Sequence, residues 1–360
     1  MAGLYQGFII AFLISLVVTP VVRKLSFWLG AVDRPDARKV HSGLMPRMGG
    51  LAVFLAFTVT VLIMGEITKS MMGLLIGGTM IMLLGLLDDI KDVSPRLKLL
   101  GQLAAAGVLV VFGIQVDFIT NPLGGTFSLT HFGINFGIPL TILWIVGITN
   151  AVNLIDGLDG LAGGLASIAA LTLAVVGWVN GQMWIVLPAV VLSAAVIGFL
   201  RYNFYPAKIF LGDSGSLYLG FMLAGMSVIG LTKQAAMFSV FVPVLIFGIP
   251  IFDTLFAILR RYINNQPIFS ADKEHLHHRL LAIGFSHRKT VLAIYGISSL
   301  LGASAVLMTF MTSEQAFALF TIITLLALIG ANRVGVLSTK AGYRVQGQFL
   351  KTENKSNFGA

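Results

Sequence analysis

The chain has 360 residues, of which 57% are hydrophobic and only 11% are charged, and it contains no cysteine. A soluble protein needs roughly a quarter of its residues charged to cover its surface, so this composition excludes a soluble fold. The lack of cysteine excludes disulfides, thiolate metal ligands and a cysteine nucleophile. The apolar residues form continuous runs rather than alternating ones, which predicts membrane helices and not a β-barrel.

Eleven apolar runs come close to the length of about twenty residues that a helix needs to cross the hydrocarbon core. The first run has no basic residue before it, Arg23 and Lys24 after it and no evident cleavage site, so we expect it to be retained. The predicted fold is all-α: a polytopic membrane bundle of about eleven transmembrane helices in residues 1–335, with a polar tail at 336–360. The helices are expected at 4–22, 48–65, 71–87, 99–116, 137–153, 161–179, 184–200, 216–232, 237–258, 290–312 and 316–332.

Basic residues lie almost entirely on one side of the predicted helices. If the first helix starts outside, 22 of the 24 Lys and Arg residues fall in cytoplasmic connections or the tail, and only Lys69 and Lys233 lie outside. The positive-inside rule therefore predicts an outside N-terminus and a cytoplasmic C-terminus. Most acidic residues and five of the six histidines lie on the same cytoplasmic side, which indicates a functional site there.

Two adjacent carboxylates, Asp88 and Asp89, end the third predicted helix. Such a pair repels itself and is costly to desolvate at the end of an apolar helix. It can be a signal that ends the helix at the water interface, or it can belong to a site that binds metal or phosphate. The basic residues that follow, among them Lys98, favour the site.

The fifth predicted helix ends in a second polar set. Asn150, Asn153 and Asp156 recur at intervals of three and can share one helix face. Asp156 and Asp159 alternate with glycines, which permit a ligand to approach the backbone closely. The connection holds no basic residue, so a bound divalent cation or a hydrogen-bonding ligand explains this set better than a solvated loop.

A third motif precedes the eighth predicted helix. Asp213 lies between Gly212 and Ser214, where it could simply cap the helix N-terminus. Asn203 and Phe210 precede it, and the phenyl ring can stack on a ligand. Mg²⁺ prefers oxygen ligands and usually keeps substrate phosphates as co-ligands, so the alternative is a metal site at Asp213.

The longest predicted cytoplasmic connection contains three histidines and an arginine: His275, His277, His278 and Arg279. We expect His275 and His278 to share a helix face while His277 points elsewhere. The spacing is not that of the His-Glu-x-x-His zinc motif. The neighbouring cations favour a phosphate-binding cluster, with a solvated basic loop as the alternative.

Two further features concern charge. Asp253 lies within the ninth predicted helix, where a charge is costly unless it faces the interior of the bundle. Basic loops beside membranes usually contact anionic lipid headgroups, and we expect this role for the first cytoplasmic connection, with contact to a substrate phosphate as the alternative. That connection contains Arg34, Asp36, Arg38, Lys39, His41 and Arg47.

The motifs resemble those of the polyprenyl-phosphate N-acetylhexosamine-1-phosphate transferases. The matching residues are Asp88-Asp89 and the runs 150–160, 212–216 and 275–279, and the resemblance extends from residue 35 to about 281. The His-Leu-His-His-Arg run is similar to the GlcNAc-1-phosphate branch, which starts teichoic acid or O-antigen-type glycans. The branch that transfers phospho-MurNAc-pentapeptide usually has three consecutive histidines and then an acid, whereas Leu276 interrupts the histidines here.

This resemblance implies transfer of GlcNAc-1-phosphate from UDP-GlcNAc to undecaprenyl phosphate, with release of UMP, on the cytoplasmic face of the bacterial inner membrane. The implied cofactor is Mg²⁺, with Mn²⁺ as the second candidate, and Asp213 is implied to bind the metal. The implied catalytic residues are Asp88, Asp89, Asp156, His275, His277 and His278. The implied substrate-binding residues are Lys98, Asn150, Asn153, Asp159, Asn203, Phe210 and Arg279.

A phosphate monoester has its second pKa near 6, so the lipid phosphate is largely dianionic at neutral pH. Charge neutralisation and in-line positioning are then the main tasks, and we expect direct attack, with a covalent aspartyl intermediate as the alternative.

Two other functional classes fit the sequence less well. A transporter would hold its charges near mid-bilayer, whereas these charges lie at one interface. An aspartyl protease would need two carboxylates that share a proton, whereas the additional Asn, Lys and His residues fit a phosphate substrate better. Membrane lipids are further expected partners, nothing indicates nucleic acid, and a homodimer stays open.

Overall fold

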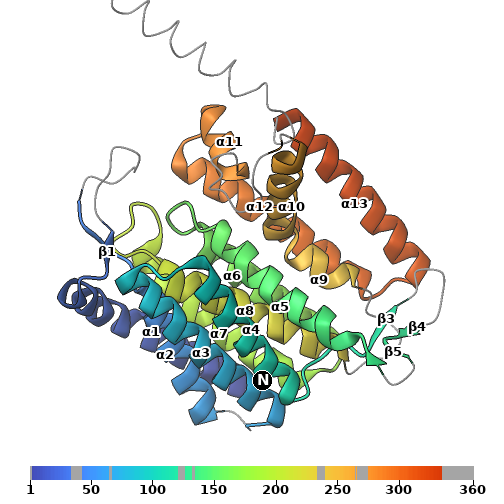
Figure 1. The fold of residues 1–360 in the computed structure, drawn as a ribbon, viewed down its shortest axis with the longest axis horizontal. Helices are drawn as coiled ribbons and strands as arrows, with labels where there is room; N and C mark the ends of the chain where they lie inside the picture. The colour runs from blue at the N-terminus through green and yellow to red at the C-terminus, as the bar shows by residue number, and fades with distance from the viewer. Residues whose placement is uncertain are drawn as a thin grey trace, which may run out of the picture.

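The computed structural model describes residues 2–33, 43–64, 67–120, 126–131, 134–232, 240–263, 265 and 275–334. Most of these residues are helical, which confirms the all-α prediction (Figure 1). The helices are α1 (Ala2–Leu29), α2 (Gly49–Met64), α3 (Lys69–Lys91), α4 (Pro95–Val111), α5 (Gly137–Leu154), α6 (Leu161–Val179), α7 (Met183–Asn203), α8 (Gly212–Thr232), α9 (Phe241–Ile246), α10 (Gly248–Ile263), α11 (Leu276–Ala282), α12 (His287–Met308) and α13 (Ser313–Val334).

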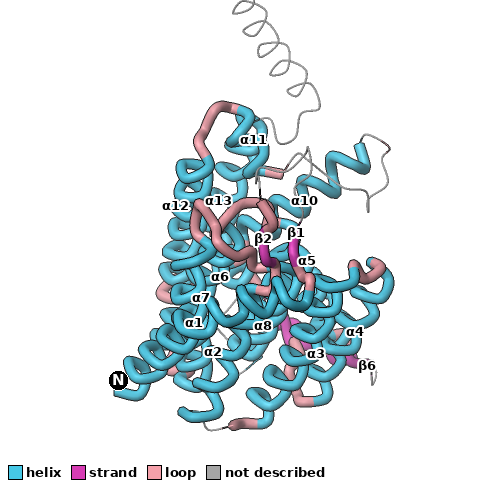
Figure 2. The backbone as a smooth tube through the Cα atoms, turned by 90° about the vertical axis from the view of Figure 1, so that its left-hand side faces the viewer, coloured by secondary structure: helices cyan, strands magenta, loops and turns pink. Residues whose placement is uncertain are grey.

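The strands in the described part of the chain are short and form three antiparallel pairs. β1 (Val32–Asp33) pairs with β2 (Met45–Pro46), β3 (Phe118–Thr120) with β4 (Thr126–Ser128), and β5 (Thr130–His131) with β6 (Ile134–Asn135). Figure 1 shows β1 at one end of the main bundle and β3 to β5 at the other end. In Figure 2, β1 and β2 lie toward the same end of the molecule as α11.

A helix lies at each of the eleven predicted positions, but the prediction of one helix over 237–258 is wrong. Within its described part, α9 ends at Ile246 and α10 begins at Gly248. Pro250 explains the break, because its nitrogen cannot donate to the carbonyl of Ile246, whereas proline is tolerated in the first turn of a new helix.

Seven of the described helices are long and apolar enough to cross a membrane: α1, α3, α5, α6, α7, α12 and α13. The helix α2 is apolar but has only 16 residues. The chain is therefore a multi-pass membrane protein, and the count of eleven spans stays a prediction. The tail at 336–360 and five charged residues of the first connection (Arg34, Asp36, Arg38, Lys39 and His41) lie outside the described residues.

The helix α8 forms the centre of the bundle, packed against α2, α3, α5 and α6. Its side chains from Ser214 to Ile229 are buried around the whole circumference. Small residues make this close packing possible, as is common between membrane helices. A Cβ on Gly50 of α2 would overlap the backbone of Gly215, so these two helices touch through their main chains.

Candidate active site

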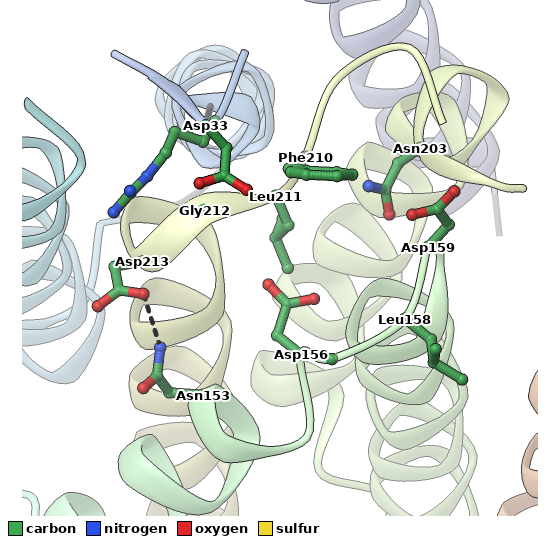
Figure 3. Close-up of a pocket in the computed structure, with 12 residues that line it drawn as sticks. Asp33, Asn153, Asp156, Leu158, Asp159, Asn203, Phe210, Leu211, Gly212 and Asp213 are labelled. Atoms are coloured by element: carbon green, nitrogen blue, oxygen red, sulfur yellow. Dashed lines mark hydrogen bonds between the residues drawn. The ribbon is translucent and has the colours of Figure 1, made fainter. Parts of the chain in front are cut away.

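A cavity of about 300 Å³ opens where the ends of α5, α7 and α8 meet the β1–β2 segment. Figure 3 shows the side chains that converge on it from the α5–α6 connection and from the segment between α7 and α8. Arg47 also lines it. Six of the predicted site residues lie in its wall: Asn153, Asp156, Asp159, Asn203, Phe210 and Asp213.

Asp89 connects the end of α3 to the start of α8. Its Oδ1 accepts a hydrogen bond from the backbone N–H of Asp213 at 2.9 Å, and its Oδ2 accepts one from that of Ser214 at 3.1 Å. The guanidinium of Arg47 lies 3.3 Å from Oδ1. Asp89 therefore caps α8 from another helix, where backbone N–H groups lack partners in their own helix. Gly212, with φ +75°, sits between them against the carbonyl of Arg47, where no side chain fits.

Lys98, near the start of α4, holds two carboxylates together. Its Nζ lies 2.6 Å from Oδ2 of Asp88 and 2.7 Å from Oδ2 of Asp213. Asp88 also accepts a hydrogen bond from the backbone N–H of Val93 at 2.7 Å. Three predicted site residues from α3, α4 and α8 thus form one charged cluster, in which a lysine offsets the repulsion between two acids.

The two asparagines of α5 have different environments. The amide of Asn153 donates to Oδ1 of Asp213 at 3.2 Å and to the hydroxyl of Ser216 at 2.8 Å, so it supports the cluster directly. Asn150 and Gln102 instead form a reciprocal amide pair, with distances of 2.7 and 3.2 Å. Asn150 is not among the residues that line the cavity.

Asp156 is a half-buried acid in the wall of the cavity. Within the described residues, no group donates a hydrogen bond to its carboxylate, which points into the space between Asp213 and Asn203 (Figure 3). Burial, assisted by the nearby carboxylates of Asp213 and others, raises the pKa of Asp156 to about 8. A cation that enters the cavity would stabilise the ionised form of Asp156.

The opposite wall of the cavity is held by main-chain bonds. The side chain of Asn203 accepts from the N–H of Gly160 at 3.1 Å and donates to the carbonyl of Ile209 at 3.0 Å. Asp159 accepts from the N–H of Ala207 at 2.9 Å. Both residues therefore shape the loops around Phe210, whose flat ring faces the cavity beside Asn203 (Figure 3).

The three histidines have three different environments. His277 is 2% exposed and lies against Gly157 of the cavity wall, where an added Cβ would overlap its imidazole. His275 is hydrogen-bonded to Asp253, and His278 is exposed. The prediction that His275 and His278 share a helix face is wrong, because α11 begins only at Leu276 and His275 precedes it in extended conformation.

His277 is a neutral group in this structure. Burial, together with the nearby imidazole of His278, lowers the pKa of His277 to about 3. Neither of its ring nitrogens has a hydrogen-bond partner within the described residues. Arg279 is buried, 8% exposed, in the same short helix. Of this run, His277 is the side chain that packs against the wall of the cavity.

The residues around the cavity fit a divalent cation. Among the described residues, no group of three or more His, Cys, Asp or Glu side chains has the geometry to hold a metal ion. Mg²⁺ does not require such a group, because it binds one or two carboxylates together with substrate phosphates. Asp156 and Asp213 line one cavity, and Asp156 has no donor of its own there.

Sequence reasoning missed Arg47, Gln102 and Asp33. The first expectation for Arg47 is contact with lipid headgroups, yet it lines the cavity and pairs with Asp89. Gln102 is buried in α4 and hydrogen-bonded to Asn150. An uncharged residue within an apolar run gave no reason to single it out. Asp33 lines the cavity from β1, and no motif marked it.

An all-α bundle with several membrane-length helices, and with carboxylates, amides and cations gathered around one cavity, has the character of a membrane-embedded enzyme. The chain matches the model of glycosyl transferase family 4 over residues 71–231. A protein of Bacillus subtilis (strain 168), described as a probable undecaprenyl-phosphate N-acetylglucosaminyl 1-phosphate transferase, is 44% identical over 342 residues, which is 94% of each chain.

Two more distant relatives have similar names. A decaprenyl-phosphate N-acetylglucosaminephosphotransferase of Mycobacterium tuberculosis (strain ATCC 25618 / H37Rv) is 39% identical over 313 residues, covering 79% of this chain and 77% of its own. An undecaprenyl-phosphate alpha-N-acetylglucosaminyl 1-phosphate transferase of Escherichia coli (strain K12) is 28% identical over 291 residues, covering 79% and 78%. The chain belongs to glycosyl transferase family 4, and it is a phosphotransferase of the membrane.

Proposed function

We propose that the protein transfers GlcNAc-1-phosphate from UDP-GlcNAc to undecaprenyl phosphate and releases UMP. The observation that carries this proposal is the meeting of Asp156, Asp213 and Asn153 in one cavity, with Lys98 bonded to Asp213 beside it. These are the groups needed to bring two phosphates together, because their negative charges must be offset by fixed cations and donors. The names of the relatives support the lipid acceptor and the sugar.

The reaction needs little base catalysis. The acceptor phosphate is largely dianionic at neutral pH, so one of its oxygens can attack the sugar-linked phosphorus directly. A bond forms between that oxygen and the phosphorus, and the bond from the phosphorus to the bridging oxygen of UMP breaks. The ammonium of Lys98 and the amide of Asn153 fix the carboxylate of Asp213 for this step. His277 offers a neutral imidazole at the wall.

Mg²⁺, held by Asp156 and Asp213, would supply the charge neutralisation of the pyrophosphate. The uridine would lie against Phe210, in the part of the cavity that Asn203 and Asp159 shape. A covalent aspartyl intermediate is the alternative mechanism. Incubation with labelled donor but without lipid acceptor separates the two mechanisms, since only the covalent one leaves label on the protein.

We further propose that eleven segments span the bacterial inner membrane, the ninth of them broken between α9 and α10, with the N-terminus outside and the cavity on the cytoplasmic face. The distribution of Lys and Arg supports this orientation, and β3 to β5 lie at the end of the bundle away from β1 (Figure 1). The product would start a cell-envelope glycan of the teichoic acid or O-antigen type. Phospho-MurNAc-pentapeptide is the alternative donor sugar, against which the interrupted histidine run argues.

Release of UMP by the purified protein tests the function. We expect release only when UDP-GlcNAc, undecaprenyl phosphate and Mg²⁺ are all present. Asp156→Asn should abolish it, whereas Asp117→Asn, an exposed acid outside the cavity, should leave it unchanged. A folded wild type that is inactive with UDP-GlcNAc but active with another UDP-sugar would reject the proposed sugar, and inactivity with every UDP-sugar would reject the proposed function.

A further inference from the structure

Asp253 is a buried acid that the proposed reaction does not use. It is the only acidic residue of α10, it is 5% exposed, and it does not line the reaction cavity. A buried carboxylate costs several kcal/mol unless hydrogen bonds or an opposite charge compensate for the loss of water. Its partners therefore indicate what the residue does.

Both carboxylate oxygens of Asp253 bind the segment that carries the histidines. A hydrogen bond of 2.8 Å joins Oδ2 to Nδ1 of His275, and Oδ1 accepts from the backbone N–H of Leu276 at 2.8 Å. Leu276 is the first residue of α11, and His275 is its N-cap residue, whose own side chain makes no capping bond. Asp253 thus provides the cap from a different helix.

The remaining surroundings of Asp253 offer no substitute. On its other side, it borders a cavity of about 550 Å³ whose walls come from α10 to α13 and are largely apolar, for example Phe252, Phe256 and Leu280. Within the described residues, no Lys or Arg side chain forms a salt bridge with Asp253, and His275 is its side-chain partner. The position of the carboxylate and the position of the α11 N-terminus therefore depend on each other.

The helix α11 needs such a connection because it has only seven residues, and helices of this length are not stable alone in water. It carries His277, which packs against Gly157, between Asp156 and Leu158 in the wall of the cavity. The rings of His275 and His277 are parallel, with an interplanar angle of 1° and centroids 5.9 Å apart. A shift of the N-terminus of α11 would therefore move His277 as well.

We propose that Asp253 is a positioning residue for the transfer reaction: through His275 and the N–H of Leu276, it fixes α11 so that His277 lies against Gly157 at the reaction cavity. This inference rests on the proposed function of the cavity. The carboxylate itself touches neither substrate, and its effect on the rate passes through the placement of His277. The two ring nitrogens of His277, which have no partner among the described residues, are the groups so placed.

Two variants separate positioning from general loss of structure. Asp253→Ala removes both hydrogen bonds. Asp253→Asn keeps an oxygen for the N–H of Leu276 but presents an amide to His275, so it should have the same effect to a smaller degree. Asp117→Asn, exposed and outside both cavities, serves as the matched control. Thermal unfolding of each purified protein establishes that it is folded at the assay temperature.

The direct readout is the accessibility of His277 to diethyl pyrocarbonate, measured residue by residue with mass spectrometry in the absence of substrates. In the wild type and in Asp117→Asn, His278 should react, whereas buried His277 should not. In folded Asp253→Ala, we expect His277 to react at least about 10-fold faster, with Asp253→Asn between the two. Unchanged protection of His277 in folded Asp253→Ala would overturn the proposal.

Steady-state UMP release provides the second readout. Misplacing a reacting group by about 1 Å can cost on the order of 100-fold in rate, so we expect kcat of Asp253→Ala to fall about 10- to 100-fold. The KM for UDP-GlcNAc should change less than about twofold, because α11 does not form the wall around Phe210. Increased labelling with an unchanged kcat would contradict the positioning role. Absence of activity in the wild type would instead reject the proposed function, and the labelling would still decide the geometry.

Discussion

Replacement of Asp89 tests whether this residue holds the structure of the site or takes part in the reaction. Its side chain has no exposed surface, and its oxygens bind the N–H groups of Asp213 and Ser214 and the guanidinium of Arg47. Asp89→Asn keeps one acceptor but turns an NH₂ group toward a donor and removes the charge. A hydrogen bond to a charged group contributes about 1.5–3 kcal/mol, and an orphaned buried donor costs about 1–3 kcal/mol.

We therefore expect Asp89→Asn to lower the free energy of unfolding by about 2–4 kcal/mol, and Asp89→Ala by about 3–5 kcal/mol because it leaves a buried partner unpaired. Thermal unfolding in detergent, read beside UMP release, measures both consequences. Activity should fall with stability, since Asp89 fixes the backbone of Asp213.

Asp92→Asn is the matched control for this experiment. Asp92 lies near the same guanidinium of Arg47, at 3.7 Å, but its side chain is 91% exposed. Exposed ion pairs contribute little, so this variant should keep both stability and activity. A folded Asp89→Asn with wild-type stability and no activity would refute the capping role and make Asp89 a reacting group.

Three further variants test other parts of the structure. Lys98→Met removes the cation that joins Asp88 to Asp213 and should lower kcat for UMP release by about 10²-fold or more, whereas full activity would contradict its role. Gly50→Ala should destabilise the protein by about 1–3 kcal/mol, because the added methyl group would overlap Gly215. Gly107→Ala is the control, because a Cβ there meets nothing within 4 Å. Equal melting temperatures of the two variants would contradict this packing. Burial lowers the pKa of His277, so the folded protein holds this imidazole neutral while the unfolded chain takes up a proton below its pKa of about 6.5. The free energy of unfolding therefore decreases as the pH falls below that value. The stability advantage of the substrate-free wild type over His277→Asn should therefore shrink between pH 7.5 and 5.5, and a difference independent of pH would contradict the shift.

The positions of the helices could be predicted because lipid requires long uncharged runs, and these are visible in one dimension. The break between α9 and α10 was missed because the run is apolar throughout, and only Pro250 marks the interruption. The motifs also indicated the cavity, since Asn153, Asp156, Asp159 and Asp213 all lie at helix ends on the predicted cytoplasmic side.

The partners of these residues could not be predicted in the same way. Asp89 binds the N–H of Asp213, which is 124 residues away, and nothing in the local sequence distinguishes a carboxylate that caps a distant helix from one that binds metal. The histidine run shows the same difficulty, because the start of α11 at Leu276 determines which imidazole packs against Gly157 in the wall of the cavity. Residue type and spacing indicate the chemistry available, whereas tertiary contacts decide which group performs it.

The central claim is that the sugar moves together with its phosphate. UDP-GlcNAc labelled with ³H in the sugar and with ³²P in the sugar-linked phosphate tests this most directly, with undecaprenyl phosphate as acceptor and the purified wild type as enzyme. The claim predicts that both labels enter the lipid in equal amounts and that unlabelled UMP is released. Lipid that contains ³H without ³²P, with labelled UDP as the second product, would show that the enzyme transfers the sugar alone and would contradict the claim.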